Sequence, residues 1–584
     1  MEERLRERVR ERLLELGWPA PAEITVERPR DPAHGDWSTS VALALARPLR
    51  RPPRAVAEEL AAGWNPDPDL VAEVSVAGPG FVNFRLRSDF LARSLREILR
   101  RPEGYLRSDD GRGRTVNVEF VSSNPTGPLH IGHGRNAALG DAIANLLEAA
   151  GWRVTREYYF NDAGRQMETL GRSLLARYVQ LSDPSFPLPE DGYEGDYLIP
   201  IAEGLREKYG DALVDPRAPE AAVAVMQRHA TEVMIDSIRE DLALFGVRFD
   251  VWFNESTLYG EGRLEAALDE LRARDAVYEH EGAVWFRASA FGDTEDRVLI
   301  KSSGQPTYLL PDVAYHMDKH ARGFARAVDV WGADHHGYVP RMQAALRVLG
   351  YAPDWLRCIV YQAVTLVEGG AAVKLSTRKA RFVTLRELLD EVGPDVARYF
   401  FLMRKADTHL LFDLDVARSQ SEENPVYYIQ YAHARVASVF ERFKEAGGGL
   451  GPLGERAPIA SGTDPHAGLS GPSPNSPVPG AHVDVERLEE AALERLDHPR
   501  EAELLRLLAD FPEVVRGAAA AAEPHRVAMF LERLAKEFHA WYHEARFLVE
   551  DVELTRARLA LARGVQIAVR RGLGLLGIRA PDSM

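Results

Sequence analysis

The sequence predicts an α/β protein whose central domain holds a doubly wound parallel sheet, with a small α+β domain before it and an all-helical domain after it. Over residues 115–160 a strand, a glycine-rich loop, a helix and a second strand follow one another, which is the βαβ unit of a Rossmann-like domain. After residue 421 the apolar pattern is helical throughout. A chain of 584 residues is too long for one core, and roughly 150 residues per domain suggests about three or four domains.

The first domain, expected over residues 1–105, mixes helix and strand. The Ala- and Leu-rich stretch 40–64 is helical in composition apart from its prolines. Val74 and Val76 alternate with other residues, and residues 81–84 follow a Gly-Pro-Gly turn, so both segments are predicted as strands.

The central domain is expected over residues 106–420. Its first strand is the apolar segment 115–121, its helix ends at Gly151, and its second strand is 153–160. In such a sheet the ligand lies at the carboxyl ends of the strands. Further strands are expected at 326–333 and within 357–367, and the largely helical, charged stretch of about 162–300 is expected to be an insertion into the sheet.

The helical domain is expected over residues 421–584. One face of its segment 524–548 is apolar, with Pro524 suited to a first turn; the apolar positions are Val527, Phe530, Leu531, Leu534, Phe538, Trp541 and Tyr542. Residues 447–483 consist mainly of Gly, Pro, Ser and Ala, which predicts a disordered surface insertion without chemistry.

Composition excludes several classes of protein. The only cysteine, Cys358, excludes an internal disulfide and a zinc site with two or more thiolates, so no structural zinc is expected. The sequence has no signal-peptide pattern and no apolar run of about 18 residues, which predicts a cytoplasmic protein, expected to be a monomer, without a membrane span. A net charge of −16 disfavours indiscriminate nucleic-acid binding but allows a local basic face.

The segment "PLHIGHG" at 128–134 places His130 and His133 around Gly132, directly before a helix. The free N–H groups at a helix start bind anions, and neutral imidazoles there can donate to phosphate oxygens. We therefore predict a nucleotide site. A metal site is the second interpretation, although it needs a third ligand that the neighbouring sequence lacks. Core histidines at a helix start fit poorly beside so much glycine.

A second cluster, "VKLSTRKARFVTL" at 373–385, groups several cations with two hydroxyls. Cations on a loop can neutralise a transferring triphosphate, although most basic runs are only solvated loops. The cations are Lys374, Arg378, Lys379 and Arg381, and the hydroxyls belong to Ser376 and Thr377.

Together these motifs resemble class I aminoacyl-tRNA synthetases, in which a "HIGH" tetrapeptide precedes a Lys-x-Ser-x-Arg-type loop, here by about 240 residues. Five blocks are similar to arginyl-tRNA synthetases in particular, and the similarity covers nearly the whole chain apart from 447–483. The blocks are "VEFVSSNPTGPLHIGHGR", "YYFNDAGRQM", "TYLLPDVAYH", "WGADHHGY" and "NPVYYIQYAHAR".

The resemblance implies activation of L-arginine by ATP with Mg²⁺ to arginyl-adenylate, then transfer to the terminal adenosine of arginine tRNA. It assigns Gly127, His130, Gly132, His133, Gly332, Asp334 and Lys374 to ATP, with His130, His133, Lys374, Ser376 and Arg378 as catalytic groups. Arginine would be bound by Glu119, Asn124, Tyr308 and Asp312, consistent with a planar cation that needs fixed carboxylates. The resemblance also implies that the domain over residues 1–105 binds tRNA and that the domain over 421–584 binds the anticodon. Tyr427, Tyr431 and Met584 are expected to contact tRNA, and no protein side chain is expected to bind a metal.

One motif departs from the family pattern. The second nucleotide motif commonly reads Lys-Met-Ser-Lys-Ser, whereas residues 374–378 read Lys-Leu-Ser-Thr-Arg, so the identity of the catalytic cation stays open. Another class I synthetase or another "HIGH"-motif nucleotidyl transferase would share the histidines but not the arginine-binding set. A non-catalytic tRNA-binding relative ranks third, because both histidines and Lys374 are present.

Overall fold

A five-stranded parallel sheet lies at the centre of the chain, in the strand order β12-β11-β5-β6-β7. The computed structural model describes residues 2–29, 31–162, 164–215, 218–373, 383–445 and 487–584. In this order the chain runs outward from β5 to one edge and then returns to add β11 and β12 on the other side, which makes the gap between β5 and β11 the switch point where ligands bind. The strands are β5 (Thr115–Glu119), β6 (Arg153–Phe160), β7 (Val251–Asn254), β11 (Arg326–Gly332) and β12 (Leu356–Tyr361).

The predicted βαβ unit is confirmed. Helix α5 (Ile131–Ala149) connects β5 to β6, and the two strands pair in parallel from Thr115 opposite Arg153 onward. Gly140 permits the close approach of helix and sheet, because a methyl group there would overlap the Phe120 ring.

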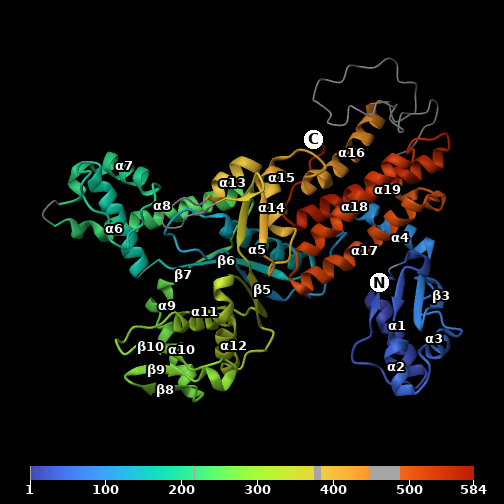
Figure 1. The fold of residues 1–584 in the computed structure, drawn as a ribbon, viewed down its shortest axis with the longest axis horizontal. Helices are drawn as coiled ribbons and strands as arrows, with labels where there is room; N and C mark the ends of the chain where they lie inside the picture. The colour runs from blue at the N-terminus through green and yellow to red at the C-terminus, as the bar shows by residue number, and fades with distance from the viewer. Residues whose placement is uncertain (1, 30, 163, 216–217, 374–382, 446–486) are drawn as a thin grey trace.

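The stretch predicted as one insertion is divided by a strand of the sheet. β7 pairs in parallel with β6, so the prediction of a single insertion over 162–300 is wrong. The first part contains α6 (Arg165–Gln180), α7 (Leu198–Tyr209) and α8 (Val223–Leu244) and projects from one end of the molecule (Figure 1). The second part forms an antiparallel sheet among helices: α9 (Ser256–Gly260), α10 (Arg263–Ala273), β8 (Val277–His280), β9 (Ala283–Phe286), β10 (Arg297–Ile300) and α11 (Leu309–Ala321).

The apolar run at 357–367 forms two strands of different sheets. β12 completes the parallel sheet after α12 (Val339–Val348), whereas β13 (Val364–Glu368) joins β14 (Ala371–Ala372) and β15 (Leu410–Asp413) in a separate three-stranded sheet. The connections to the helical domain are α13 (Leu385–Val392), α14 (Pro394–Leu402) and α15 (Leu414–Arg418).

The N-terminal domain is a four-stranded antiparallel sheet covered by helices, as predicted, in the order β1-β2-β4-β3. It lies at the opposite end of the molecule from α6 and α7 (Figure 1). Its elements are α1 (Glu2–Glu15), β1 (Val26–Glu27), β2 (Trp37–Thr39), α2 (Val41–Leu49), α3 (Pro53–Ala61), β3 (Val71–Ala77), β4 (Phe81–Leu86) and α4 (Ser88–Arg100).

The C-terminal domain consists of α16 (Pro425–Glu445), α17 (Pro499–Ala521), α18 (His525–Glu544) and α19 (Val552–Leu575), which confirms the helical prediction. The apolar face predicted on α18 is buried from Val527 to Trp541. The predicted disordered insertion 447–483 lies outside the described residues. No helix within the described part of the chain is both long and apolar enough to cross a membrane.

Candidate active site

A cavity of about 770 Å³ lies at the switch point, where the carboxyl ends of β5 and β11 separate. Its size is within the range of small-molecule sites. Eight of the residues that the sequence assigned to ATP or arginine line this one cavity: Glu119, Asn124, His130, His133, Tyr308, Asp312, Gly332 and Asp334.

The backbone leaves β5 in a conformation that opens this cavity. Val121 and Ser122 have positive φ angles of 65° and 43°, a backbone conformation that residues other than glycine rarely adopt. Asn136 holds the turn: its Oδ1 accepts from the Val121 N–H at 2.8 Å, and its Nδ2 donates to the Val330 carbonyl at 3.0 Å. One buried amide therefore links the ends of β5 and β11 beside the ligand site.

His130 and His133 form a stacked pair at the start of α5. The ring centroids lie 3.7 Å apart with 18° between the planes. Nδ1 of His130 accepts from the Gly132 N–H at 3.0 Å, and Nδ1 of His133 accepts from the His130 N–H at 3.3 Å. Gly132 is required, because a methyl group there would lie 2.9 Å from Cε1 of His130. His130 is thus the N-cap residue of α5, and His133 in the first turn completes a capping box with it.

These contacts fix the protonation of both rings. A Nδ1 that accepts a backbone hydrogen bond carries no proton, so each neutral ring keeps its N–H at Nε2. Burial lowers the pKa of His130, and burial together with the neighbouring His130 lowers the pKa of His133 to about 3. Two neutral Nε2–H donors therefore accompany the positive end of the α5 dipole, an arrangement suited to phosphate oxygens.

Gly127 lines a neighbouring cavity of about 640 Å³ rather than the first one. The two cavities share Asn124, His130 and His133, so the histidine pair forms part of both walls. Asn124 is held between two elements: its Nδ2 donates to Gln166 at 2.8 Å, and its Oδ1 accepts from the Asn161 N–H at 3.1 Å.

The other end of the cavity is acidic. Asp312 and Glu255 both line it. Among the described residues, the only side-chain groups that hydrogen-bond to these two carboxylates are hydroxyls. The Tyr338 hydroxyl donates to Asp312, while Tyr159 at 2.8 Å and Tyr259 at 3.4 Å donate to Glu255. Neither carboxylate pairs with a lysine or arginine in the described part of the chain, because the two arginines that also line the cavity lie against Asp293 instead.

Burial shifts the titration of both groups. It raises the pKa of Asp312 to about 6, opposed by the Tyr338 hydroxyl, and it also raises the pKa of Glu255. A bound cation would offset this cost of burying charge. The side chain of Asp312 does not cap α11: Tyr308 is the N-cap residue, and a carboxylate oxygen of Asp312 accepts from the Tyr338 hydroxyl.

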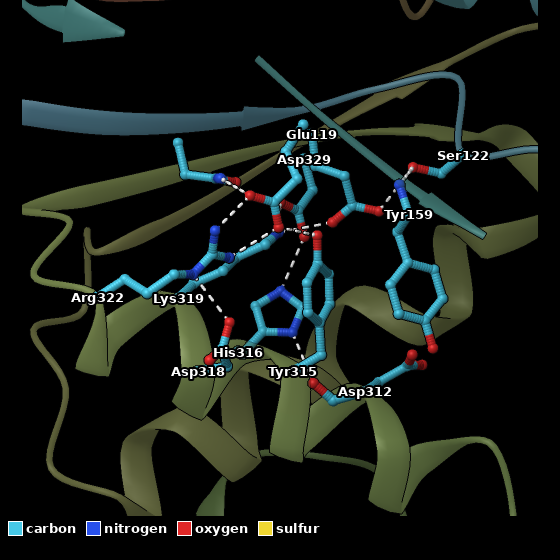
Figure 2. A network of polar contacts seen from close by, with 12 residues as sticks. Glu119, Ser122, Tyr159, Asp312, Tyr315, His316, Asp318, Lys319, Arg322 and Asp329 are labelled. Atoms are coloured by element: carbon cyan, nitrogen blue, oxygen red, sulfur yellow. Dashed lines mark hydrogen bonds and ion pairs between the residues drawn. The ribbon is translucent and has the colours of Figure 1, made fainter. Parts of the chain in front are cut away.

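Glu119 has a buried partner that the sequence did not indicate. Lys319 Nζ lies 2.6 Å from Glu119 and 2.9 Å from Asp329, and Nε2 of His316 lies 2.8 Å from Asp329 (Figure 2). Burial raises the pKa of Glu119, whereas Lys319 and His316 hold that of Asp329 at about 2. The second oxygen of Glu119 accepts from the Ser122 hydroxyl at 2.9 Å. The floor of the cavity is thus a buried network in which one lysine, Lys319, pairs with both Glu119 and Asp329.

The remaining predicted ligands differ in solvent exposure, and three of them lie outside the described residues. Gly332 ends β11, and a methyl group there would crowd the exposed Asp334 carboxylate. Tyr308 is 76% exposed at the cavity mouth. Lys374, Ser376 and Arg378 lie outside the described residues, but the chain after them is fixed beside the histidines: Thr384 pairs with His130, and the Leu385 N–H donates to the Leu129 carbonyl at 2.7 Å.

The residues expected to contact tRNA lie in the helical domain, away from the cavity. On α16 the rings of Tyr427 and Tyr431 are 6.4 Å apart and nearly parallel, and both are half-buried. Arg435 lies over the Tyr431 ring at 4.4 Å and over the Tyr542 ring at 4.5 Å. Met584 is 49% exposed. Within the described residues, no group of three or more His, Cys, Asp or Glu side chains is arranged to hold a metal ion.

Three family models match the chain in the order of its domains. They are "Arginyl tRNA synthetase N terminal domain" over residues 3–86, "tRNA synthetases class I (R), catalytic domain" over 95–187 and 207–412, and "DALR anticodon binding domain" over 481–584. The arginine–tRNA ligase of Geobacillus thermodenitrificans is 45% identical over 588 residues, covering 100% of this chain and 99% of the relative.

The chain belongs to the arginyl-tRNA synthetase family. The arginine–tRNA ligase of Syntrophotalea carbinolica is 46% identical over 562 residues, covering 96% of this chain and 95% of the relative. The arginyl-tRNA synthetase structure from Thermus thermophilus superimposes with a TM-score of 0.73 at 25% identity, covering 100% of both chains. This member of the family is therefore an ATP-using enzyme that attaches arginine to its tRNA, and the other predicted class I functions are not favoured.

Proposed function

We propose that the cavity between β5 and β11 carries out both steps of arginine–tRNA ligation, with ATP at its histidine end and arginine at its acidic end. One observation carries the proposal: a single cavity joins two neutral Nε2–H donors at a helix start to two carboxylates that lack a cation in the described residues. One end fits a polyanion and the other fits a guanidinium.

The histidine end supports the first chemical step. An oxygen of the arginine carboxylate attacks the α-phosphorus of ATP, the bond to the β-phosphate breaks, and pyrophosphate leaves. His130 and His133 donate to phosphate oxygens as negative charge develops on them, and they need no proton transfer to do so. In the second step a ribose hydroxyl of the terminal adenosine attacks the arginyl carbonyl carbon and passes its proton to an oxygen of the adenylate phosphate, and AMP leaves as the bond between the carbonyl carbon and the phosphate oxygen breaks.

The acidic end supports the choice of amino acid. Asp312 and Glu255 receive the guanidinium, whose five donors need fixed acceptors. Asn124 accepts from the α-ammonium group, and the exposed Tyr308 covers the bound amino acid at the cavity mouth. Glu119 supports them from the floor, where Lys319 already balances its charge.

Gly332 and Asp334 receive the ATP ribose, and Gly127 leaves room beside the phosphates. Mg²⁺ accompanies ATP as a complex held by the phosphates and water, because the ion keeps most of its water ligands when it binds a nucleotide. Lys374 and Arg378 offset negative charge on the reacting phosphate, Ser376 offers it a hydroxyl donor, and the chain after them is anchored at His130. Neither a structural zinc nor a metal ligand among the side chains is part of the proposal.

Tyr427, Tyr431 and Met584 contact the tRNA anticodon, since aromatic faces suit unstacked bases. A cytoplasmic location and a monomeric state complete the proposal, and light scattering of the purified chain tests the second. Arginine-dependent exchange of pyrophosphate into ATP, measured with and without arginine tRNA, tests the whole. Exchange that arginine does not stimulate under either condition would refute it.

The assignment of the acidic end is tested by Asp312→Asn and Glu255→Gln, which keep shape but replace an acceptor by a donor. Breaking one partner of a buried charge pair costs about 2–5 kcal/mol, so each variant should slow arginine activation by a factor on the order of 10²–10³, with the KM for ATP unchanged. The wild type should reject citrulline by a similar factor, because a neutral urea leaves the carboxylates unpaired.

Asp241→Asn is the matched control. Asp241 is a buried carboxylate on α8 that pairs with Arg386 at 2.7 Å and does not line the cavity. We expect this variant to melt at a lower temperature and to activate arginine as the wild type does. Normal arginine activation by Asp312→Asn or Glu255→Gln would remove that residue from the guanidinium site.

A further inference from the structure

Arg398 is a buried arginine on α14 that contacts three other elements. Its side chain is 1% exposed. Nε donates to the Leu576 carbonyl at 3.0 Å, Nη1 donates to the Phe245 carbonyl at 3.0 Å, and Nη2 forms an ion pair with Asp141. These partners lie 178, 153 and 257 residues away in the sequence, so this one guanidinium joins parts of the chain that are distant from each other.

Two of these contacts are at helix ends. Phe245 is the C-cap residue directly after α8, and Leu576 is the C-cap residue directly after α19. The last carbonyls of a helix lack partners within the helix and carry partial negative charge, so a cation binds them well. Arg398 therefore caps a helix of the insertion and the final helix of the anticodon-binding domain at once, while Asp141 balances its charge.

The third contact leads towards the ATP site. Asp141 is a residue of α5, the helix that begins directly after His130. α14 follows α5 back towards that start, because Phe401 lies so close to Gly134 that a methyl group there would be 3.0 Å from its ring. A second tie runs from α5 to α19, where Asn145 donates to the Leu575 carbonyl at 3.3 Å. The end of α19 is thus tied to the second half of α5, the helix whose first turn carries the histidine pair.

The chain makes room for the guanidinium at Gly577. This residue follows α19 with a φ of +69°, and a methyl group there would overlap the Arg398 guanidinium. The guanidinium is the mobile end of a side chain, so an alanine would displace it and break its hydrogen bonds. A substitution in the anticodon-binding domain can therefore move Arg398 without touching the active-site cavity.

We propose that Arg398 is a positioning residue for arginine activation, which fixes α5, and with it His130 and His133, relative to the end of the anticodon-binding domain. The inference rests on the proposed binding of ATP by the histidine pair. Arg398 touches no substrate; it acts by holding the helix on which the phosphate donors stand. A displacement on the order of 1 Å at reacting groups can cost about 10²-fold in rate.

The test uses the full-length enzyme, with arginine-dependent pyrophosphate exchange in the presence of arginine tRNA, active-site titration and thermal melting. We expect Gly577→Ala and Arg398→Lys each to lower kcat by a factor on the order of 10–100 per active site, with the KM for arginine unchanged. The double variant should be no slower than the slower single variant, because both act through one guanidinium.

Gly17→Ala is the matched control for backbone strain. Gly17 also follows a helix, with a φ of +68°, but nothing lies within 4 Å of the added methyl group. We expect it to keep the wild-type kcat. If Gly577→Ala and Arg398→Lys melt earlier but retain the wild-type kcat per active site, Arg398 is structural only and the proposal fails; multiplied effects in the double variant would also overturn it. Should Gly577→Ala not fold, Arg398→Lys decides alone.

His133→Ala separates this proposal from the one on which it rests. If His133→Ala activates arginine at the wild-type rate, the ATP assignment fails and the role of Arg398 fails with it. If His133→Ala is slow while Gly577→Ala and Arg398→Lys are not, only the role of Arg398 is refuted.

Discussion

At the scale of single residues, Asp312 lies at the proposed guanidinium site, and burial of its ionised carboxylate lowers the stability of the free enzyme. Burial raises its pKa to about 6 from 3.8, so the folded protein binds a proton there more tightly than the unfolded chain does. The stability contributed by this group is therefore fully present below about pH 4 and is lost as the pH rises through 6. At neutral pH the ionised carboxylate destabilises the free enzyme, and a bound guanidinium relieves that cost.

This ionisation predicts the pH dependence of arginine binding. As the pH falls through about 6, Asp312 takes up a proton and loses its attraction for the guanidinium, so the KM for arginine should rise. Exchange kinetics between pH 5 and 8 measure this. The pH profile of the KM for arginine should be much flatter for Asp312→Asn. The free energy of unfolding of this variant at pH 8 should not fall below that of the wild type. A pH profile that the substitution leaves unchanged would show that another group controls binding.

The sequence identified eight residues of the cavity lining but not the ion pairs beneath them. The motif blocks assigned Glu119 and Asp312 directly. Lys319 lies 200 residues from Glu119 in the sequence, and neither a motif block nor an apolar pattern marks it as a partner. Glu255 was also missed, although it directly follows β7 and thus stands at the carboxyl end of a parallel strand. The signal existed, but it needed β7 to be recognised as a strand.

At the scale of elements, β7 and β13 show where pattern reasoning fails. β7 has four residues, all half-buried at the sheet edge, so it has neither the length nor the apolar run of a central strand. β12 and β13 are separated by only Gln362 and Ala363, and their apolar residues read as one run although they belong to different sheets. α5 and α18 were predictable because long helices repeat their pattern many times.

The segment between β14 and α13 contains the second nucleotide motif, and the roles of its two lysines can be tested. Its described flank pairs with His130, and Lys374 matches the first lysine of the second nucleotide motif. Because a contact made mainly in the transition state is worth roughly 3–4 kcal/mol, Lys374→Ala should slow adenylate formation far more than Lys379→Ala does. Single-turnover adenylate formation measures both. Equal impairment, or a slower Lys379→Ala, would mean that the register assigned to this motif is wrong.

At the scale of the whole molecule, we expect residues 447–483 to be dispensable. Their composition offers little to pack, and a change of loop length alters closure entropy by only about 0.6 kcal/mol per doubling. Replacing them by a short Gly/Ser linker should leave the melting temperature and tRNA charging nearly unchanged. A large fall in either, seen by calorimetry or by a charging assay, would assign the segment a structural or functional role.

Helix α4 has a consequence for the order in which the molecule can assemble. Its apolar face packs on helices that the ribosome synthesises last. Leu95 lies so close to Gly564 of α19 that a methyl group on that glycine would overlap the leucine. The nearby Tyr105 hydroxyl donates to the Leu508 carbonyl of α17 at 2.7 Å. About 400 residues separate α4 from α17. At about 5–20 residues per second, a ribosome needs roughly 20–80 s to supply the partner. For that interval the nascent chain carries an uncovered hydrophobic stripe, so α4 is a segment to which a chaperone has time to bind.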